Sequence, residues 1–254
     1  MVKKDTNKTD DSCEWLFGIH AVQAILKTSP DKIDEVRVQK GRDDQRLKKL
    51  ISLAEQQDIP VTWVLRSDLD ALAGGRHQGV AALCRGADIQ DENYLYELLE
   101  QLDQAPFLLV LDGVTDPHNL GACMRSADAA GVQAVIVPKD NSVGMTPTVQ
   151  KVACGAAESV PLVVVTNLSR TLKQLQEQGL WIVGTAGETE QMIYDVDLKG
   201  PLVMVMGAEE KGLRRLTREN CDLLVKLPMA GAVSSLNVSV ATGVCLFEAV
   251  RQRS

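Results

Sequence analysis

A polar cluster of Ser234, Ser235 and Asn237 stands at the start of an apolar segment near the end of the chain, after a loop that runs from Pro228 to Gly231. Hydroxyl and amide groups supply both hydrogen-bond donors and acceptors. A glycine beside them lets the main chain approach a ligand closely. The pattern therefore predicts that this loop binds a small polar molecule.

The apolar segment that follows has the spacing of a helix. Leu236, Val240, Val244 and Phe247 recur at helical intervals and share one face, which predicts a buried C-terminal helix. Ser235 then stands where an N-cap belongs, so capping is an alternative to a functional role. Capping does not explain Asn237, one residue inside the expected helix start.

Two further polar segments lie upstream and follow apolar strands. Residues 107–138 read as a strand, a polar turn, a helix closed by Gly131 and a second strand, which is one βαβ unit. Residues 202–228 read as a strand, a short helix and another strand. Ligands bind at the carboxyl edge of such open sheets, so we expect all three polar segments to meet there.

Several other chemistries lack their defining residues. Gly207 and Gly212 have the spacing of a phosphate loop, but Leu213 and Arg214 stand where Lys and Ser or Thr are required. The sequence also contains no G-x-G-x-x-G after a strand and no G-x-S-x-G. A nucleotide hydrolase, a dinucleotide oxidoreductase and an α/β-hydrolase are therefore excluded.

Three ordered runs resemble the signature motifs of the SpoU (TrmH-like) RNA ribose 2′-O-methyltransferases of the SPOUT superfamily. They are Asp112-Gly-Val-Thr-Asp-Pro-His-Asn-Leu-Gly-Ala with Arg125, Met206-Gly-Ala-Glu-Glu-Lys-Gly-Leu, and Ser234-Ser-Leu-Asn-Val-Ser-Val-Ala. Upstream, Gly18-Ile-His-Ala-Val-Gln-Ala-Ile-Leu and His77-Gln-Gly-Val-Ala resemble the small N-terminal RNA-binding domain of the family. The resemblance is strongest to members that methylate a guanosine of bacterial 23S ribosomal RNA.

The resemblance implies methylation of the ribose 2′-hydroxyl of a specific guanosine in 23S ribosomal RNA, with S-adenosylmethionine as the methyl donor. It implies an α/β fold, in which a C-terminal parallel-sheet domain with a deep trefoil knot follows a small N-terminal α/β domain. It also implies a homodimer with the active site near the subunit interface, where the arginine of the first motif is often supplied across that interface.

The matching positions give the site residues that the resemblance implies. The catalytic set is Asn119, Arg125, Glu209, Ser235 and Asn237. The cofactor-binding set is Thr185, Ala186, Gly187, Gly207, Leu227, Met229, Ser235, Leu236 and Asn237. A free guanidinium has a pKa above about 12, so orientation of the ribose and its phosphate suits Arg125 better than a general-base role. A helix cap for Asn119 and a surface salt bridge for Arg125 are the structural alternatives.

Composition is that of an ordinary soluble globular protein. The 254 residues are 45% hydrophobic and 24% charged, and no apolar run approaches the length of a membrane span. The polar N-terminus lacks the apolar core of a signal peptide, so we expect a cytoplasmic protein. Six cysteines without a C-x-x-C pair and three histidines without zinc spacing predict no metal site.

The N-terminal half alternates helices and strands. Expected helices cover residues 19–28, 44–57 and 67–73, and expected strands cover residues 34–39, 61–65 and 79–84. The acidic, hydrophilic stretch that follows is typical of a linker. We therefore expect a disordered tail over 1–13, an RNA-binding domain over 14–86, a linker over 87–105 and the methyltransferase domain over 106–254.

The net charge of −7 is unusual for a protein that binds RNA. Basic residues nevertheless gather in the N-terminal half, and those expected to contact RNA are Arg42, Arg46, Lys48, Lys49 and His77. The alternative is that these residues only solvate a helix. A local basic face on an acidic protein would keep non-specific RNA binding weak.

Overall fold

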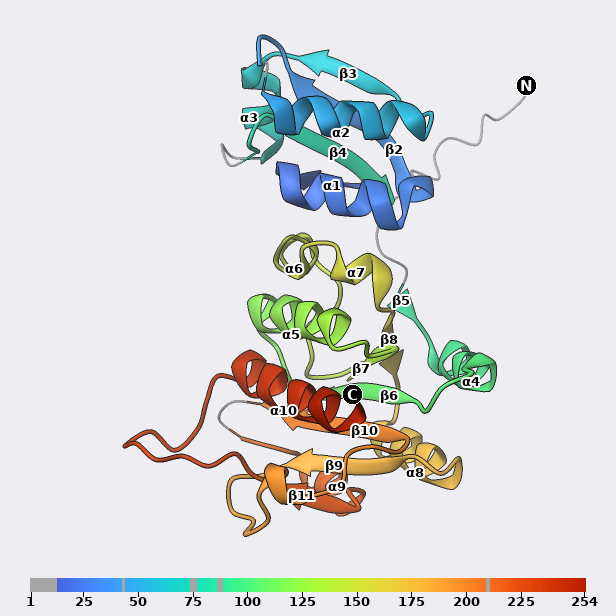
Figure 1. Ribbon diagram of the computed structural model, residues 1–254, viewed down its shortest axis with the longest axis vertical. Coiled ribbons are helices and arrows are strands. Elements are labelled where there is room, and N and C mark those ends of the chain that lie inside the picture. The colour runs from blue at the N-terminus through green and yellow to red at the C-terminus, as the bar shows by residue number, and fades with distance from the viewer. Residues whose placement is uncertain (1–12, 43, 74–76, 86–88, 209–210) are drawn as a thin grey trace, which may run out of the picture. The chain divides into compact units, whose positions relative to one another are not determined.

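The computed structural model describes residues 13–42, 44–73, 77–85, 89–208 and 211–254. The chain divides into two compact units, which span residues 1–87 and 88–254. Figure 1 shows helices and strands in both units. No helix within the described ranges combines the length and hydrophobicity of a membrane span.

The first unit is a four-stranded sheet with strand order β1-β4-β2-β3. Its elements are β1 (Cys13–Phe17), α1 (Ile19–Thr28), a 3-10 turn (Pro30–Lys32), β2 (Ile33–Gln39), α2 (Gln45–Gln56), β3 (Val61–Val64), α3 (Arg66–Ala73) and β4 (Val80–Arg85). Val22 and Leu26 of α1, Leu50 of α2 and Val36 of β2 share one buried core, so both helices pack on the sheet. The elements expected between residues 19 and 84 are confirmed with small boundary shifts, whereas β1 was not foreseen.

The second unit is built on a seven-stranded sheet of order β11-β9-β10-β6-β7-β8-β5, in which every strand pair is parallel. Its elements are β5 (Ile89–Gln90), α4 (Glu92–Gln101), β6 (Phe107–Asp112), α5 (Pro117–Ala129), β7 (Ala134–Pro138), α6 (Pro147–Ala153), α7 (Ala156–Ser159), β8 (Leu162–Val165), α8 (Leu168–Glu177), β9 (Trp181–Thr185), a 3-10 turn (Ile193–Asp195), β10 (Leu202–Gly207), α9 (Arg215–Glu219), β11 (Leu223–Val225) and α10 (Val238–Arg253). Strands β6 and β7 are buried along their whole length, as expected for parallel strands covered on both faces. The expected α/β fold with a parallel sheet is confirmed, and the trefoil knot stays a prediction.

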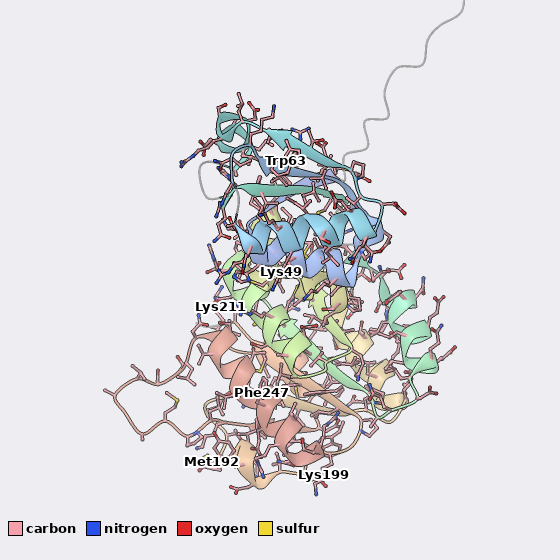
Figure 2. The ribbon with its side chains drawn as sticks, turned by 45° about the horizontal axis from the view of Figure 1, so that its top comes forward. Lys49, Trp63, Met192, Lys199, Lys211 and Phe247 are labelled. Carbon is pink, nitrogen blue, oxygen red and sulfur yellow. The ribbon has the colours of Figure 1, made fainter. Side chains whose placement is uncertain are left out.

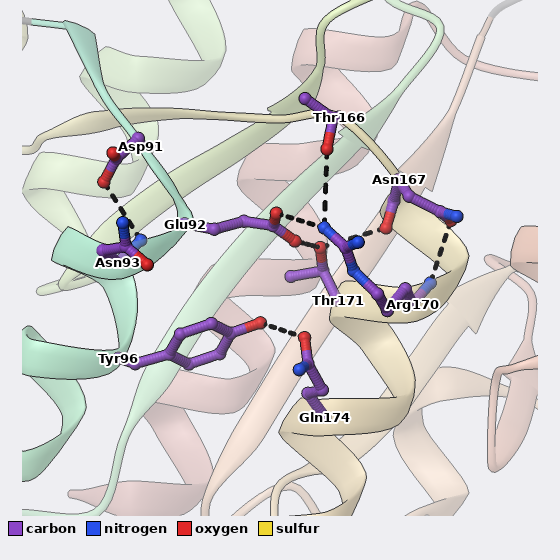
Figure 3. A network of polar contacts seen from close by, with 9 residues as sticks. All are labelled: Asp91, Glu92, Asn93, Tyr96, Thr166, Asn167, Arg170, Thr171 and Gln174. Carbon is purple, nitrogen blue, oxygen red and sulfur yellow. Dashed lines mark hydrogen bonds and ion pairs between the residues drawn. The ribbon is translucent and has the colours of Figure 1, made fainter.

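Most of the stretch expected to be a linker over residues 87–105, namely residues 89–105, belongs to the second unit. Strand β5 pairs with β8, and Leu95 of α4 is completely buried in the core of this unit. Figure 3 shows how α4 is joined to α8: Glu92 accepts hydrogen bonds from Arg170 at 2.6 Å and from Thr171 at 2.5 Å. The segment looked like a linker because it is highly charged, although its leucines have helical spacing.

The last helix, α10, presents a different face to the core from the one expected. Leu236, Val240, Val244 and Phe247 are between 36% and 52% exposed. The buried side chains of α10 are those of Val238, Thr242, Cys245, Leu246, Glu248 and Ala249. Apolar residues occur on both faces of this helix, so spacing alone could not determine which face is buried. The exposed set is called the α10 stripe below.

Candidate functional site

Four strands end beside one another at the carboxyl edge of the second sheet. The last residues of β6, β9, β10 and β11 are Asp112, Thr185, Gly207 and Val225. Two cavities open among the loops that follow these strands. The three polar segments of the sequence meet here, as the carboxyl-edge argument predicts.

The first cavity, called the β9 cavity, has a volume of about 650 Å³. Eight of the nine residues expected to bind the cofactor line it: Thr185, Ala186, Gly187, Gly207, Leu227, Met229, Ser235 and Leu236. Its wall also includes apolar side chains such as Met206 and Leu213, and the charged side chains of Glu188 and Lys226. A pocket of this size and mixed character suits a ligand with both an apolar ring and charged groups.

Gly207 determines how the wall of the β9 cavity closes. A Cβ atom on Gly207 would lie 2.3 Å from the carbonyl carbon of Gly212, far inside van der Waals contact. Only glycine therefore lets the end of β10 pack against residues 212–213. The close approach brings the main chain of both segments to the cavity.

The second cavity, called the β6 cavity, has a volume of about 630 Å³. Its polar lining residues are Asp112, Thr115, Asp116, Asn119, Asn141, Lys211 and Arg214. The two cavities share Ala208, Lys211, Gly212 and Val238 as wall. A group bound in one cavity can therefore approach a ligand bound in the other.

Asn119 and Asn237 meet between the two helices that border these cavities. The Asn237 side chain donates from Nδ2 to Asn119 Oδ1 at 3.0 Å. Asn237 is itself the N-cap of α10, since its Oδ1 accepts from the backbone N–H of Ser239 at 2.9 Å. Ser235 therefore does not cap this helix, and its place in an exposed loop leaves it free to line the β9 cavity.

The structure also excludes the capping alternative for Asn119. The N-cap of α5 is Asp116, whose carboxylate accepts from the backbone N–H of His118 at 2.8 Å. Pro117 then occupies the first helical position, where its missing N–H costs nothing. Asn119 lies within the first turn and lines the β6 cavity.

The remaining two catalytic candidates lie differently. Arg125 is exposed on α5, lines neither cavity and has its Nη1 atom 3.7 Å from Cys154 Sγ. Glu209 lies outside the described residues, as does its neighbour Glu210. The single chain thus brings together Asn119, Ser235 and Asn237, but not Arg125.

An ion pair between Asp112 and Arg214, which the sequence did not predict, holds the loop between the cavities in place. Asp112 is completely buried, and its Oδ1 lies 2.5 Å from Arg214 Nε. The second oxygen of Asp112 accepts from the backbone N–H of Arg214 at 2.9 Å. A buried carboxylate at the end of an apolar strand needs a charged or hydrogen-bonding partner. That rule could have predicted from the sequence that Asp112 is paired.

Two other arginines of this region are also paired with carboxylates, which balance their positive charge. Arg218 contacts Glu188, and Arg215 lies 2.7 Å from Glu219 one helical turn away. Two thiols of this unit, the half-buried Cys221 and the buried Cys245, are poor nucleophiles. Burial raises the pKa of Cys221 and of Cys245 to about 12, so both stay protonated at neutral pH.

The basic residues of the first unit differ in how far they are exposed. Arg46, Lys48 and Lys49 are exposed on α2, where Figure 2 labels Lys49. Arg42 is half-buried, with its Nε 2.7 Å from Asp44. His77 differs from the expectation: it is buried, and both ring nitrogens have partners within the unit, so its side chain is not placed to contact RNA.

Comparison with protein families gives two matches that together cover most of the chain. Residues 106–247 match the SpoU rRNA Methylase family. Residues 15–90 match a family described as RNA 2′-O ribose methyltransferase substrate binding. The first match includes every loop that lines the β9 and β6 cavities.

Individual relatives extend this similarity over nearly the whole chain. The chain is 62% identical over 240 residues to the 23S rRNA (guanosine-2′-O-)-methyltransferase RlmB of Pseudomonas putida, covering 94% of this chain and 97% of that protein. It is 59% identical to the protein of the same name from Escherichia coli, covering 95% of this chain and 99% of that one.

Solved structures agree on the fold. The SpoU methyltransferase AviRb from Streptomyces viridochromogenes, in complex with AdoMet, superposes with a TM-score of 0.78 at 22% identity, over 98% of this chain and 94% of that chain. A structure described as an RNA 2′-O ribose methyltransferase gives a TM-score of 0.77 at 26% identity, over 95% of this chain and 89% of that chain.

Proposed function

The chain belongs to the SpoU rRNA methylase family, and on that premise we propose that it transfers a methyl group from S-adenosylmethionine to the ribose 2′-hydroxyl of a specific guanosine in 23S ribosomal RNA. The observation that carries the proposal is the β9 cavity. Its lining brings together residues from the loops after β9, β10 and β11, and eight of them are positions that the resemblance to the family assigns to the cofactor.

The residues of the β9 cavity suit S-adenosylmethionine, which supplies a methyl carbon made electrophilic by its sulfonium. Met206, Leu213 and Leu227 offer apolar surface for an adenine ring, and the backbone around Gly187 and Gly207 offers hydrogen bonds. The proposed contacts are those of the nine residues from Thr185 to Asn237 that the sequence analysis gave for the cofactor. Asn237 would act from the edge, because it does not line the cavity.

The acceptor hydroxyl is a poor nucleophile and needs orientation before anything else. We assign that task to Asn119, Ser235 and Asn237, because the bonded pair of asparagines lies where the two cavities share a wall. Arg125 would hold the ribose phosphate, since a guanidinium is charged at any working pH. Glu209 keeps the catalytic assignment that the family resemblance gives it.

The transfer needs no metal, because the sulfonium of the donor leaves as a neutral thioether and requires no Lewis acid. Within the described residues, no group of three or more His, Cys, Asp or Glu side chains is arranged to hold a metal ion. Chelation by EDTA should leave the rate of transfer unchanged.

The protein would act as a homodimer. The α10 stripe exposes three large apolar side chains on the helix and Leu236 just before it, and burying such a patch against a second copy is favourable. A second copy would also explain the position of Arg125, which lines neither cavity of its own chain. We propose that each subunit supplies Arg125 to the site of the other.

The first unit would bind the ribosomal RNA. Arg42, Arg46, Lys48 and Lys49 lie at the start of α2, where their positive charge can neutralise phosphates. His77 would support this region from within. We retain residues 14–86 as the RNA-binding domain and 106–254 as the methyltransferase domain, and we infer a cytoplasmic location because ribosomal RNA is the substrate.

The test is transfer of a radiolabelled methyl group from S-adenosylmethionine to a 23S ribosomal RNA transcript by the purified protein. We expect incorporation at one guanosine, mapped by the resistance of its 2′-O-methylated ribose to alkaline cleavage. A 16S ribosomal RNA transcript is the matched control and should stay unlabelled. Labelling of transfer RNA instead, or of no RNA, would refute the proposed substrate.

A further inference from the structure

Three segments of the first unit that are distant in sequence line one cavity of about 530 Å³. Its lining residues are Ile19, His20, Arg42, Asp44, Gln45, Arg46 and Gln78. The cavity lies at the N-terminal ends of α1 and α2 and is called the α1–α2 cavity. The two N-terminal sequence motifs, which begin at Gly18 and His77, contribute adjacent walls to it.

Hydrogen bonds fix the walls of this cavity in place. Gln78 adopts a left-handed backbone conformation with φ of 51°, and its side-chain Oε1 accepts from the backbone N–H of Ile19 at 3.1 Å. Arg42 donates from Nη1 to the carbonyl oxygen of Gln78 at 2.5 Å. Gly79 follows with a φ of 78°, a left-handed backbone conformation that favours glycine. Because these hydrogen bonds already hold the cavity walls in position, the protein loses less conformational entropy when a ligand binds.

His77 supports the turn from beneath. Its Nδ1 accepts from the backbone N–H of Gly79 at 2.9 Å, so the ring hydrogen lies on Nε2, which contacts Asp70 at 3.1 Å. These two contacts of the imidazole hold the turn in position. His77 is a positioning residue for Gln78, which explains why a buried histidine belongs to this motif.

The charges of the cavity favour an anion. The carboxylate of Asp44 accepts from the backbone N–H of Leu47 at 3.0 Å and from Arg42 Nε at 2.7 Å. These contacts, the bond from Leu47 foremost, lower the pKa of Asp44, so the carboxyl stays ionised and balances Arg42. The exposed side chains of Arg46 and His20 remain to attract a phosphate.

We infer that the α1–α2 cavity binds one unpaired nucleotide of the ribosomal RNA substrate, with Arg46 and His20 on its phosphate and the amides of Gln45 and Gln78 on its base. The volume lies within the range of sites for small ligands. Sequence-specific proteins read RNA through unpaired bases, and amide side chains can hydrogen-bond base edges while cations hold the backbone. The inference rests on the proposed function, since it takes the substrate to be RNA.

The test is binding of a 23S ribosomal RNA transcript to the full chain at several salt concentrations. His20→Ala combined with Arg46→Ala should weaken binding about 10-fold or more at low salt, and should lower the slope of log affinity against log salt by about 1 for each phosphate that is no longer neutralised. Gln45→Ala should weaken discrimination against unrelated RNA without changing the slope. Both His20 and Arg46 are exposed, so their replacement should not affect folding.

Lys27→Ala is the matched control, since Lys27 is an exposed cation in the last turn of α1, away from the cavity. Binding of S-adenosylmethionine, measured without RNA, should match the unmodified protein in every variant. The inference is overturned if the double variant binds RNA like Lys27→Ala, or if duplex RNA competes as well as single-stranded RNA. Failure of the proposed function would show instead as absent transfer by the unmodified protein.

Discussion

Asn237 Nδ2 donates to Asn119 Oδ1 at 3.0 Å, which joins the N-cap of α10 to the first turn of α5 across 118 positions of sequence. Each residue comes from a different sequence motif. The bond holds both side chains at the wall where the β9 and β6 cavities meet. The bond thus joins the N-cap of α10 to Asn119, which lines the β6 cavity, and so links the stability of the helix to the geometry of the site.

Asn237→Asp should separate these two roles. An aspartate keeps the cap bond from Ser239 but removes the amide donor to Asn119, so we expect stability near that of the unmodified protein and a transfer rate lowered at least 10-fold. Asn237→Ala should lower the rate similarly and also cost about 1 kcal/mol of unfolding free energy through loss of the cap. Urea denaturation and methyl transfer measure the two effects. Full activity of Asn237→Asp would show that the Asn237 amide has no role in the mechanism.

Arg125→Ala should keep binding of S-adenosylmethionine and lose transfer. Mixed dimers then test whether Arg125 acts across the interface. If Arg125→Ala is paired with Asn237→Ala, one of the two sites regains both side chains when the arginine comes from the other subunit, and activity returns. When the arginine acts within its own chain, every site keeps one defect and the mixture stays inactive. Each variant alone is the control.

The α10 stripe should be the dimer interface. Phe247→Glu places a charge among the exposed apolar side chains, so we expect the dimer to dissociate, as measured by light scattering during gel filtration. Trp181→Glu is the matched control because Trp181 is 48% exposed and Phe247 49%, and Trp181 begins β9. A monomeric unmodified protein, or a dimeric Phe247→Glu variant, would contradict the assignment.

Arg214→Ala should destabilise the second unit by about 1–3 kcal/mol, because it leaves the buried Asp112 carboxylate with only one backbone donor from residue 214. The comparison is Arg215→Ala, which removes an exposed pair with Glu219 and should cost about 0.5 kcal/mol or less. Chemical denaturation gives both values. Equal effects from the two variants would show that the Asp112 pair has no special importance.

The buried carboxylate of Glu248 predicts a loss of stability in acid. Hydrogen bonds from Arg251 and Gln252 lower the pKa of Glu248 to about 2 in the folded protein. A lowered pKa contributes stability above the pKa of the unfolded chain, near about 4.3, and that contribution is lost as the pH falls toward 2. Thermal melts should show this fall, and Glu248→Gln should flatten it. An unchanged pH profile in that variant would exclude Glu248 as its source.

Local sequence patterns predicted much of this molecule. The apolar runs of β6 and β10 and the polar segments after them determined a parallel sheet and its binding edge, because burial on both faces requires continuous apolar strands. The motifs also predicted the lining of the β9 cavity, apart from Asn237. Apart from β1, the helices and strands of the first unit followed from periodicity.

Only the tertiary structure decided which groups meet. Residues 89–101 looked like a linker, but the burial of Leu95 and the bonds of Glu92 to α8 make them part of the second unit. The sequence placed His77 on the RNA surface, whereas its two ring contacts hold it inside the unit. The spacing of α10 was read correctly and its buried face was not. Periodicity fixes which residues share a face, whereas the partner that covers each face depends on residues far away in the chain.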